Sequence, residues 1–171
     1  MSIVKKLIFN MVENLITEGE FTYKEGGEGK PMILLHGLMG TASMFDDVFT
    51  YFCKNGYNVL VPELPIYSLP MLKTNVKHFS LFIKRFIDHK KLDNAILIGN
   101  SLGGHIALYL AKNYPELVHS LVLTGSSGLY ENAMGDSYPK RGDIEYIRNK
   151  TESVFYDPKH ATPEMIDNLF E

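Results

Sequence analysis

The chain is 171 residues long, 45% hydrophobic and 22% charged, a composition typical of one globular domain or slightly more. Its 17 basic residues stand against 20 acidic ones, a net charge of −3, so no basic field is present to bind nucleic acid. The single cysteine, Cys53, excludes an intrachain disulfide, and the six histidines lack the spacing of a zinc site. No apolar run reaches the roughly 18–20 residues that span a bilayer. We therefore expect a cytoplasmic protein without a metal or cofactor.

The first 19 residues are predicted to form an amphipathic helix. Lys5, Lys6 and Glu13 interrupt its apolar run and no small-residue cleavage site follows, which argues against a signal peptide. We expect the helix to pack on the body of the protein, with docking on a membrane surface or on a partner as the alternative. Its apolar side chains recur at helical spacing and are Ile3, Val4, Leu7, Ile8, Met11, Val12 and Leu15.

Residues 20–125 alternate between strand-like and helix-like segments. A helix is expected between an N-cap at Thr41 and a C-cap at Gly56, and two others over about 74–90 and 102–113. This alternation predicts right-handed β-α-β crossovers, and hence an α/β fold with a mainly parallel sheet and helices on both faces. The expected strands cover residues 21–24, 31–36, 57–61, 95–99 and 121–123.

The composition changes after Gly125. Residues 126–142 are polar and rich in turn-forming residues, and two helical segments are expected after them, at about 144–154 and 163–170. No strand signal appears in this part of the sequence. We interpret it as a helical insertion above the sheet rather than another β-α-β unit.

The strongest chemical signal is Gly99-Asn100-Ser101-Leu102-Gly103, which directly follows a buried strand and directly precedes a helix. A serine hydroxyl is a poor nucleophile and needs tight presentation and a nearby base. A sharp turn here is expected to give Ser101 a positive φ and to aim the Leu102 N–H and the helix N-terminus at a developing oxyanion. The flanking glycines, extended by Gly104, leave room for the crossing backbones. A purely structural turn is the alternative.

His36-Gly37-Leu38 ends the first buried strand and supplies a second part of the predicted site. Gly37 would let the backbone bend close to the serine, and the Leu38 N–H could be a second oxyanion donor. His36 is a candidate base, but we interpret a histidine at a buried strand end as a residue that orients the loop by hydrogen bonding. His105, one turn into the helix after Ser101, is expected to point away from the serine.

These two strand–turn–helix units resemble the α/β-hydrolase fold superfamily, and most closely its single-domain esterases and carbon–carbon bond hydrolases. The resemblance covers residues 20–125 as the core and 126–171 as the start of a helical lid. It implies Ser101 as the nucleophile and the backbone N–H groups of Leu38 and Leu102 as the oxyanion hole. The serine argues against the dehalogenases and epoxide hydrolases of the superfamily, which use an aspartate. Supporting positions in the turn and loop would be His36, Gly37, Gly99, Asn100, Gly103 and Gly104.

The superfamily pattern also requires an acid and then a histidine after later strands. Because this chain stops inside the expected lid, the resemblance implies that both lie beyond Glu171 and that the 171-residue chain is inactive by itself. The strand around Val122 would then form an open sheet edge. Such an edge invites pairing, so a homo-oligomer or a swapped assembly is expected.

Three functions remain open from the sequence. The first is a carboxylesterase-like enzyme that cleaves an ester or related acyl bond of a small, apolar substrate through an acyl-enzyme at Ser101. The second is a hydrolase of the same fold that cleaves a carbon–carbon bond beside a carbonyl; some of these carry an asparagine before the nucleophile, as Asn100 does here. The third is a non-catalytic binding module. For all three we expect no metal, cofactor, nucleic acid or membrane partner.

Overall fold

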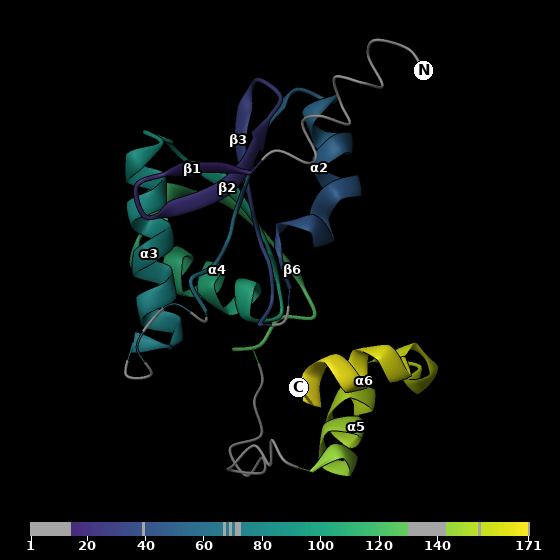
Figure 1. Cartoon of the computed structure of the whole chain (residues 1–171). Coiled ribbons are helices and arrows are strands. Elements are labelled where there is room, and N and C mark those ends of the chain that lie inside the picture. The colour runs from purple at the N-terminus through teal and green to yellow at the C-terminus, as the bar shows by residue number, and fades with distance from the viewer. Residues whose placement is uncertain are drawn as a thin grey trace. The chain divides into compact units, whose positions relative to one another are not determined.

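The computed structural model describes residues 15–38, 40–66, 68, 70, 73–129, 143–153 and 155–170. The chain divides into two compact units, Met1–Glu131 and Asn132–Glu171. The first unit contains a β-sheet with helices on its faces, and the second contains helical segments (Figure 1).

One mixed sheet of six strands forms the body of the first unit. Its strands are β1 (Ile16–Glu18), β2 (Phe21–Gly26), β3 (Lys30–Leu35), β4 (Tyr57–Pro62), β5 (Ala95–Asn100) and β6 (Val118–Thr124). They lie in the order β1-β2-β4-β3-β5-β6, in which β3, β4, β5 and β6 run parallel and β1 and β2 pair antiparallel to their neighbours. The predicted α/β fold with a mainly parallel sheet is therefore confirmed, with an antiparallel hairpin at one edge.

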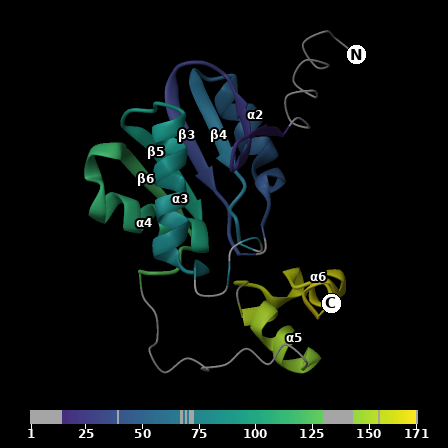
Figure 2. The same cartoon turned by 60° about the vertical axis from the view of Figure 1, so that its left-hand side comes forward.

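Helices cover both faces of this sheet, as predicted. α2 (Asp46–Cys53) lies on one face, and α3 (Val76–His89) and α4 (Leu102–Asn113) lie on the other (Figures 1 and 2). A short 3-10 turn, η3 (Pro115–Leu117), connects α4 to β6. Within the described residues, no helix is long and apolar enough to cross a membrane.

The strand β3 explains how the two faces are filled. Met32 and Leu34 pack with Phe45 on the α2 side, whereas Ile33 and Leu35 pack on the side of α3 and α4. Successive side chains of a strand point to opposite faces, so a strand that is buried on both sides needs apolar residues at every position. This is the continuous apolar run that predicts the strand from the sequence.

The predicted helix over residues 1–19 is wrong at its C-terminal end, and residues 1–14 lie outside the described part of the chain. Ile16–Glu18 form β1, which pairs antiparallel with β2 across a turn at Gly19, where φ is +60°. Ile16 and Thr17 are β-branched and favour a strand. Ile16 also packs against the core, so sheet pairing overrides the helical spacing here.

The helix after β3 begins differently from the prediction. Ala42–Phe45 form a 3-10 turn, η1, and α2 starts only at Asp46. The Thr41 side chain does not cap the helix; its hydroxyl lies 2.7 Å from the Ser43 hydroxyl instead. The Ala42 N–H donates to Glu63 Oε1 at 2.8 Å. A carboxylate from the loop after β4 thus replaces the local cap, and nothing in the sequence around Thr41 signals this.

The described part of the second unit consists of α5 (Ile144–Ser153), the 3-10 turn η4 (Pro158–His160) and α6 (Pro163–Phe170). Asp143 Oδ1 accepts the N–H groups of Glu145 and Tyr146 at 3.1 Å each, which caps α5. The two helices predicted near 144–154 and 163–170 are confirmed. The interpretation of residues 126–171 as the start of a lid stays a prediction, and residues 130–142 lie outside the described part.

Candidate active site

Ser101 lies in the sharp turn between β5 and α4, at the carboxyl end of a parallel strand. Its φ is +51° and its ψ is −116°, the conformation of the first central residue of a type II′ turn, which favours glycine. The predicted positive φ is confirmed. The residue is exposed and directly precedes the first turn of α4, whose backbone N–H groups have no acceptors within the helix. A strained, exposed serine at this place is typical of a functional site.

Three glycines make this turn sterically possible. A Cβ atom at Gly103 would overlap the backbone carbonyl of Leu35 on β3, and one at Gly99 would lie 2.5 Å from the Gly103 carbonyl oxygen. A Cβ atom at Gly104 would overlap the hydroxyl of Ser126. A side chain at any of these positions would therefore push the helix away from its neighbours. The prediction that these glycines provide clearance is confirmed.

Gly37 brings the loop after β3 against the turn that holds the serine. A Cβ atom at Gly37 would lie 3.2 Å from Ser101 Cβ and 3.3 Å from Asn100 Oδ1. Leu38 follows directly and is 52% exposed. The structure therefore brings together the loop with Leu38 and the turn with Leu102, as the sequence predicts. Their roles as oxyanion donors stay predictions.

His36 is buried, and the backbone contacts both of its ring nitrogens. Nδ1 lies 2.8 Å from the Gly37 carbonyl oxygen, and the Leu64 N–H donates to Nε2 at 2.9 Å. Because Nε2 accepts a hydrogen bond, Nδ1 is the nitrogen that donates, and its acceptor is the Gly37 carbonyl oxygen. Both nitrogens thus form hydrogen bonds to loop backbone, which agrees with the loop-orienting interpretation of His36; that role stays a prediction.

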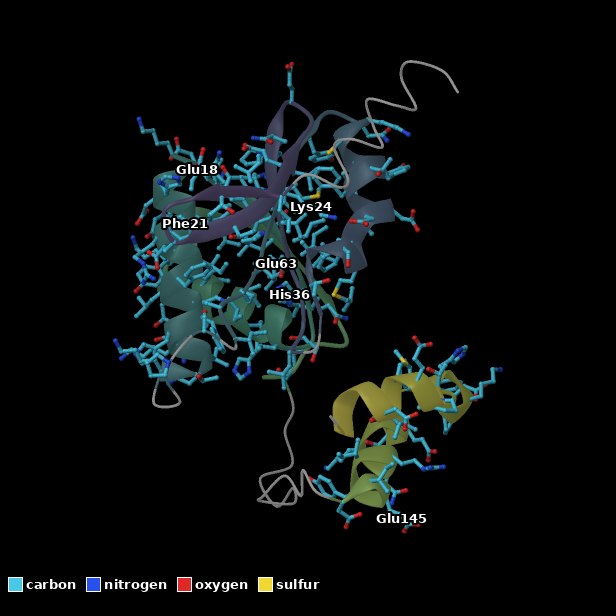
Figure 3. The ribbon with its side chains drawn as sticks, viewed as in Figure 1. Glu18, Phe21, Lys24, His36, Glu63 and Glu145 are labelled. Carbon is cyan, nitrogen blue, oxygen red and sulfur yellow. The ribbon has the colours of Figure 1, made fainter. Side chains whose placement is uncertain are left out.

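Glu63 is a residue of this region that the sequence analysis missed. Its Oε1 accepts the Ala42 N–H at 2.8 Å, and its Oε2 lies 3.4 Å from His36 Nε2 (Figure 3). Because His36 Nε2 accepts the Leu64 N–H, it does not also donate to Glu63. Glu63 instead connects the loop after β4 to the loop after β3. Its signal in the sequence is slight, a single acidic residue between Pro62 and Pro65 at the end of a buried strand.

The end of β6 and the segment that follows it contact the turn from its other side. Asn100 Nδ2 donates to the Thr124 carbonyl oxygen at 3.1 Å, and the Ser101 N–H donates to the same oxygen at 3.1 Å. His105 Nδ1 lies 3.4 Å from the Ser127 hydroxyl, so the ring faces this segment. An exposed serine, a helix N-terminus and three loops thus meet at one end of the sheet, an arrangement that can stabilise negative charge beside a hydroxyl.

Comparison with known proteins identifies the family. Residues 30–153 match the family model of the alpha/beta hydrolase fold. The chain belongs to the α/β-hydrolase fold family. Among solved structures, it resembles an alpha/beta hydrolase enzyme from the metagenome of sediments from the lagoon of Mar Chica, Morocco, with 57% identity and a TM-score of 0.66 over 70% of this chain and 54% of that one.

Two curated relatives are bacterial hydrolases. A 2-hydroxy-6-oxo-6-phenylhexa-2,4-dienoate hydrolase of Comamonas testosteroni is 26% identical over 87% of this chain and 58% of its own length. A 2-hydroxy-6-oxononadienedioate/2-hydroxy-6-oxononatrienedioate hydrolase of a Pseudomonas species is 28% identical over 91% of this chain and 62% of its own length. The α/β-hydrolase chain described here thus spans less than two thirds of either relative.

Proposed function

We propose that the protein is a serine hydrolase that cleaves an ester or a related acyl bond through an acyl-enzyme at Ser101. The main support is the exposed serine with a φ of +51° between β5 and the N-terminus of α4. The helix dipole and the first N–H groups of α4 favour negative charge beside that hydroxyl. Membership of the α/β-hydrolase family and the hydrolase names of the relatives support the same class of reaction.

In the proposed reaction, Ser101 Oγ attacks the carbonyl carbon of the substrate while a base removes the hydroxyl proton. The carbonyl oxygen becomes an oxyanion, which the N–H groups of Leu38 and Leu102 would stabilise. The bond to the leaving group then breaks, and the leaving group takes the proton. Water hydrolyses the acyl-enzyme and regenerates the serine, so that ester and water give acid and alcohol.

We place the base and the acid of this mechanism after residue 171, in a longer form of the protein. His36 is a poor candidate for the base, because its two ring nitrogens contact the Gly37 carbonyl and the Leu64 N–H. This chain covers 58% of the length of the matched relative from Comamonas testosteroni, so that relative contains further residues outside the shared region. On this proposal, residues 1–171 hold the nucleophile and the oxyanion donors but hydrolyse esters only slowly.

The proposed substrate is small and apolar. Leu38 and Met44 are 52% and 48% exposed, and the Met44 sulfur lies beside Gly40 in the loop that follows Leu38. Exposed apolar residues on the loop whose Gly37 lies against the Ser101 turn support an apolar acyl group.

A second candidate is cleavage of a carbon–carbon bond beside a ketone. The names of the two curated relatives favour this candidate. They describe hydrolases of 2-hydroxy-6-oxo dienoates, and the 6-oxo group is a ketone. Asn100, held by Thr124 directly before the serine, agrees with this reading because some carbon–carbon hydrolases of the superfamily carry asparagine there. The attack of the serine on a carbonyl carbon is shared by both candidates.

The test uses the full-length gene product, a fluorophosphonate probe and p-nitrophenyl acetate. We expect the probe to label Ser101 and the ester to be hydrolysed. Ser101→Ala should abolish labelling and lower kcat roughly 10⁴-fold or more. Ser120→Ala removes an exposed serine at the start of β6 and should match the wild type.

Turnover that survives in Ser101→Ala would overturn the proposal. Hydrolysis of a 2-hydroxy-6-oxo dienoate without hydrolysis of the ester would favour the carbon–carbon candidate. A folded full-length protein that is neither labelled nor active on either substrate would favour the non-catalytic binding module.

A further inference from the structure

We infer that Ser127, in the loop after β6, is a positioning residue for the nucleophile and for the oxyanion donor that follows it. This inference rests on the proposed function, because it assigns Ser127 a role in aiming Ser101 and the Leu102 N–H. Ser127 is far from the G-x-S-x-G segment in the sequence, and no motif marks it.

The segment Thr124–Ser127 binds the backbone on both sides of the nucleophile. Before it, the Ser101 N–H donates to the Thr124 carbonyl oxygen at 3.1 Å. After it, the Ser127 N–H donates to the Ser101 carbonyl oxygen at 3.3 Å, and the Ser127 hydroxyl donates to the same oxygen at 3.5 Å. Both peptide groups that flank the strained residue are therefore held, one by the end of β6 and the other by the loop that follows it.

The second of these peptide groups links the serine to the proposed oxyanion donor. A peptide unit is planar and trans, so the Ser101 carbonyl and the Leu102 N–H belong to one rigid plane and point in opposite directions. Hydrogen bonds that fix the carbonyl therefore fix the direction of the N–H. The same carbonyl also accepts the His105 N–H at 3.2 Å, the first bond of α4. The helix and the loop together thus fix the orientation of the peptide plane between Ser101 and Leu102. Ser127 supplies the hydrogen bonds to this plane that do not come from the helix.

The loop is seated on the first turns of α4, which explains how Ser127 keeps its place. The Ser126 hydroxyl donates to the Ser127 carbonyl oxygen at 2.7 Å, and it lies where a side chain at Gly104 would be. Gly128 has a φ of +83°, and a Cβ atom there would lie 2.5 Å from Cδ2 of His105. The Ser127 hydroxyl is also 3.4 Å from His105 Nδ1. Close packing at two glycines leaves the loop little freedom to move relative to the turn.

Removing the Ser127 hydroxyl should affect the transition state more than substrate binding, because the oxyanion forms only during the reaction. In the full-length gene product with p-nitrophenyl acetate, we expect Ser127→Ala to lower kcat about 5-fold and to change KM less than about 2-fold. This is below the roughly 10²–10³-fold cost of deleting an oxyanion donor outright, because the backbone N–H of residue 127 remains. Ser127→Thr keeps a hydroxyl and should restore most of the lost kcat. Ser120→Ala is the matched control and should be unchanged.

A second readout does not depend on activity. In protein labelled with nitrogen-15 leucine, Ser127→Ala should shift the amide resonance of Leu102, and Ser120→Ala should not. An unshifted resonance with unchanged kcat in Ser127→Ala would overturn the inference. So would equal losses of kcat in the alanine and threonine variants, which would indicate a packing role only.

The same two readouts separate this inference from the proposed function. If the wild type shows no labelling or turnover but the Leu102 resonance still shifts in Ser127→Ala, the proposed function fails while the positioning contact stands. If the wild type is active and Ser127→Ala equals it in kcat and in the Leu102 resonance, only the inference fails.

Discussion

The backbone of Ser101 is held in a conformation that residues with a side chain rarely adopt, with φ at +51° and ψ at −116°. Such strain costs of order 1–3 kcal/mol. Glycine adopts positive φ without this cost but loses about 0.5–1 kcal/mol more conformational entropy on folding. We predict that Ser101→Gly raises the free energy of unfolding by about 1 kcal/mol, whereas Ser101→Ala changes it by less than about 0.5 kcal/mol. Urea denaturation measures both. A glycine variant less stable than the alanine variant would show that residue 101 stores no strain.

Gly103 offers a second test at the level of a single residue. A methyl group there would overlap the backbone carbonyl of Leu35 on β3, which cannot move without disturbing the sheet. We predict that Gly103→Ala destabilises the protein by about 3 kcal/mol and abolishes labelling of Ser101. Gly40→Ala is the matched control, because the atom nearest to its new methyl group is the flexible Met44 sulfur, at 2.7 Å. Denaturation curves that show equal losses for the two variants would contradict this account.

The residues of the site differ in how far the sequence could predict them. Ser101 and its glycines form one contiguous strand–turn–helix pattern, so the positive φ of the serine follows from local sequence alone. Glu63 and Ser127 reach the site through contacts across the fold. Their sequence neighbourhoods contain no repeat, spacing or motif that reports those contacts. The sequence therefore predicts the serine turn, but it does not predict the contacts that distant loop residues make with the site.

At the level of elements, the β1–β2 hairpin is tied to α3 by a set of polar contacts. Both carboxylate oxygens of Glu20 accept hydrogen bonds from Arg85, from Nε and Nη2, at 2.8 Å each. Glu18 accepts from the Tyr23 hydroxyl at 2.9 Å and contacts His89 Nε2 at 2.9 Å. Phe21 packs on the ring of Phe82 beneath these pairs, with centroids 5.2 Å apart. The hairpin is thus fixed by apolar packing with a polar rim.

The Glu20–Arg85 pair gives this hairpin a dependence on pH. Hydrogen bonds from the guanidinium lower the pKa of the Glu20 carboxyl below its ordinary value of 4.5. Because the pKa is lower in the folded state, the pair stabilises the fold fully at pH values above the ordinary pKa of the carboxyl. This stabilisation is lost as the pH falls through the lower pKa of the folded state. We predict that Glu20→Gln destabilises the protein by about 0.5 kcal/mol at pH 7, since the pair is exposed. Below the folded pKa, the difference from the wild type should close.

The measurement is the free energy of unfolding in urea at a series of pH values from 7 down to acid conditions. Glu28→Gln serves as the control, because Glu28 is an exposed carboxylate in the turn before β3. Its difference from the wild type should stay near zero throughout. A difference for Glu20→Gln that persists unchanged in acid would show that the hydrogen bonds to Arg85 do not depend on the carboxylate charge.

Elements with a strong apolar pattern are predicted well, and elements set by pairing are not. The buried strands β3 and β5 and the helix α4 follow from unbroken apolar runs and from the glycine and proline positions around them. β1 has only three residues and is formed by its pairing with β2, so no hydrophobic periodicity in the sequence predicts it. The start of α2 depends on a distant carboxylate in the same way.

At the level of the whole molecule, the described sheet places β6 at the edge opposite β1. β6 pairs with β5 from Ala95 to Asn100, and Val122 on it is 45% exposed. An edge strand of seven residues offers backbone N–H and C=O groups to any other strand, and apolar side chains strengthen such pairing. The edge expected from the sequence around Val122 is therefore present in the structure.

We predict from this edge that the 171-residue chain self-associates, so that light scattering reports a mass above that of the monomer and rising with concentration. Val122→Lys should shift the distribution toward monomer, because a charge on an edge strand opposes pairing with another chain. Tyr51→Lys is the matched control: Tyr51 is 62% exposed on α2, on a face of the sheet rather than at its edge. Equal effects of the two lysine variants would mean that general surface hydrophobicity drives association. A monomer at every concentration would mean that the β6 edge recruits no other chain.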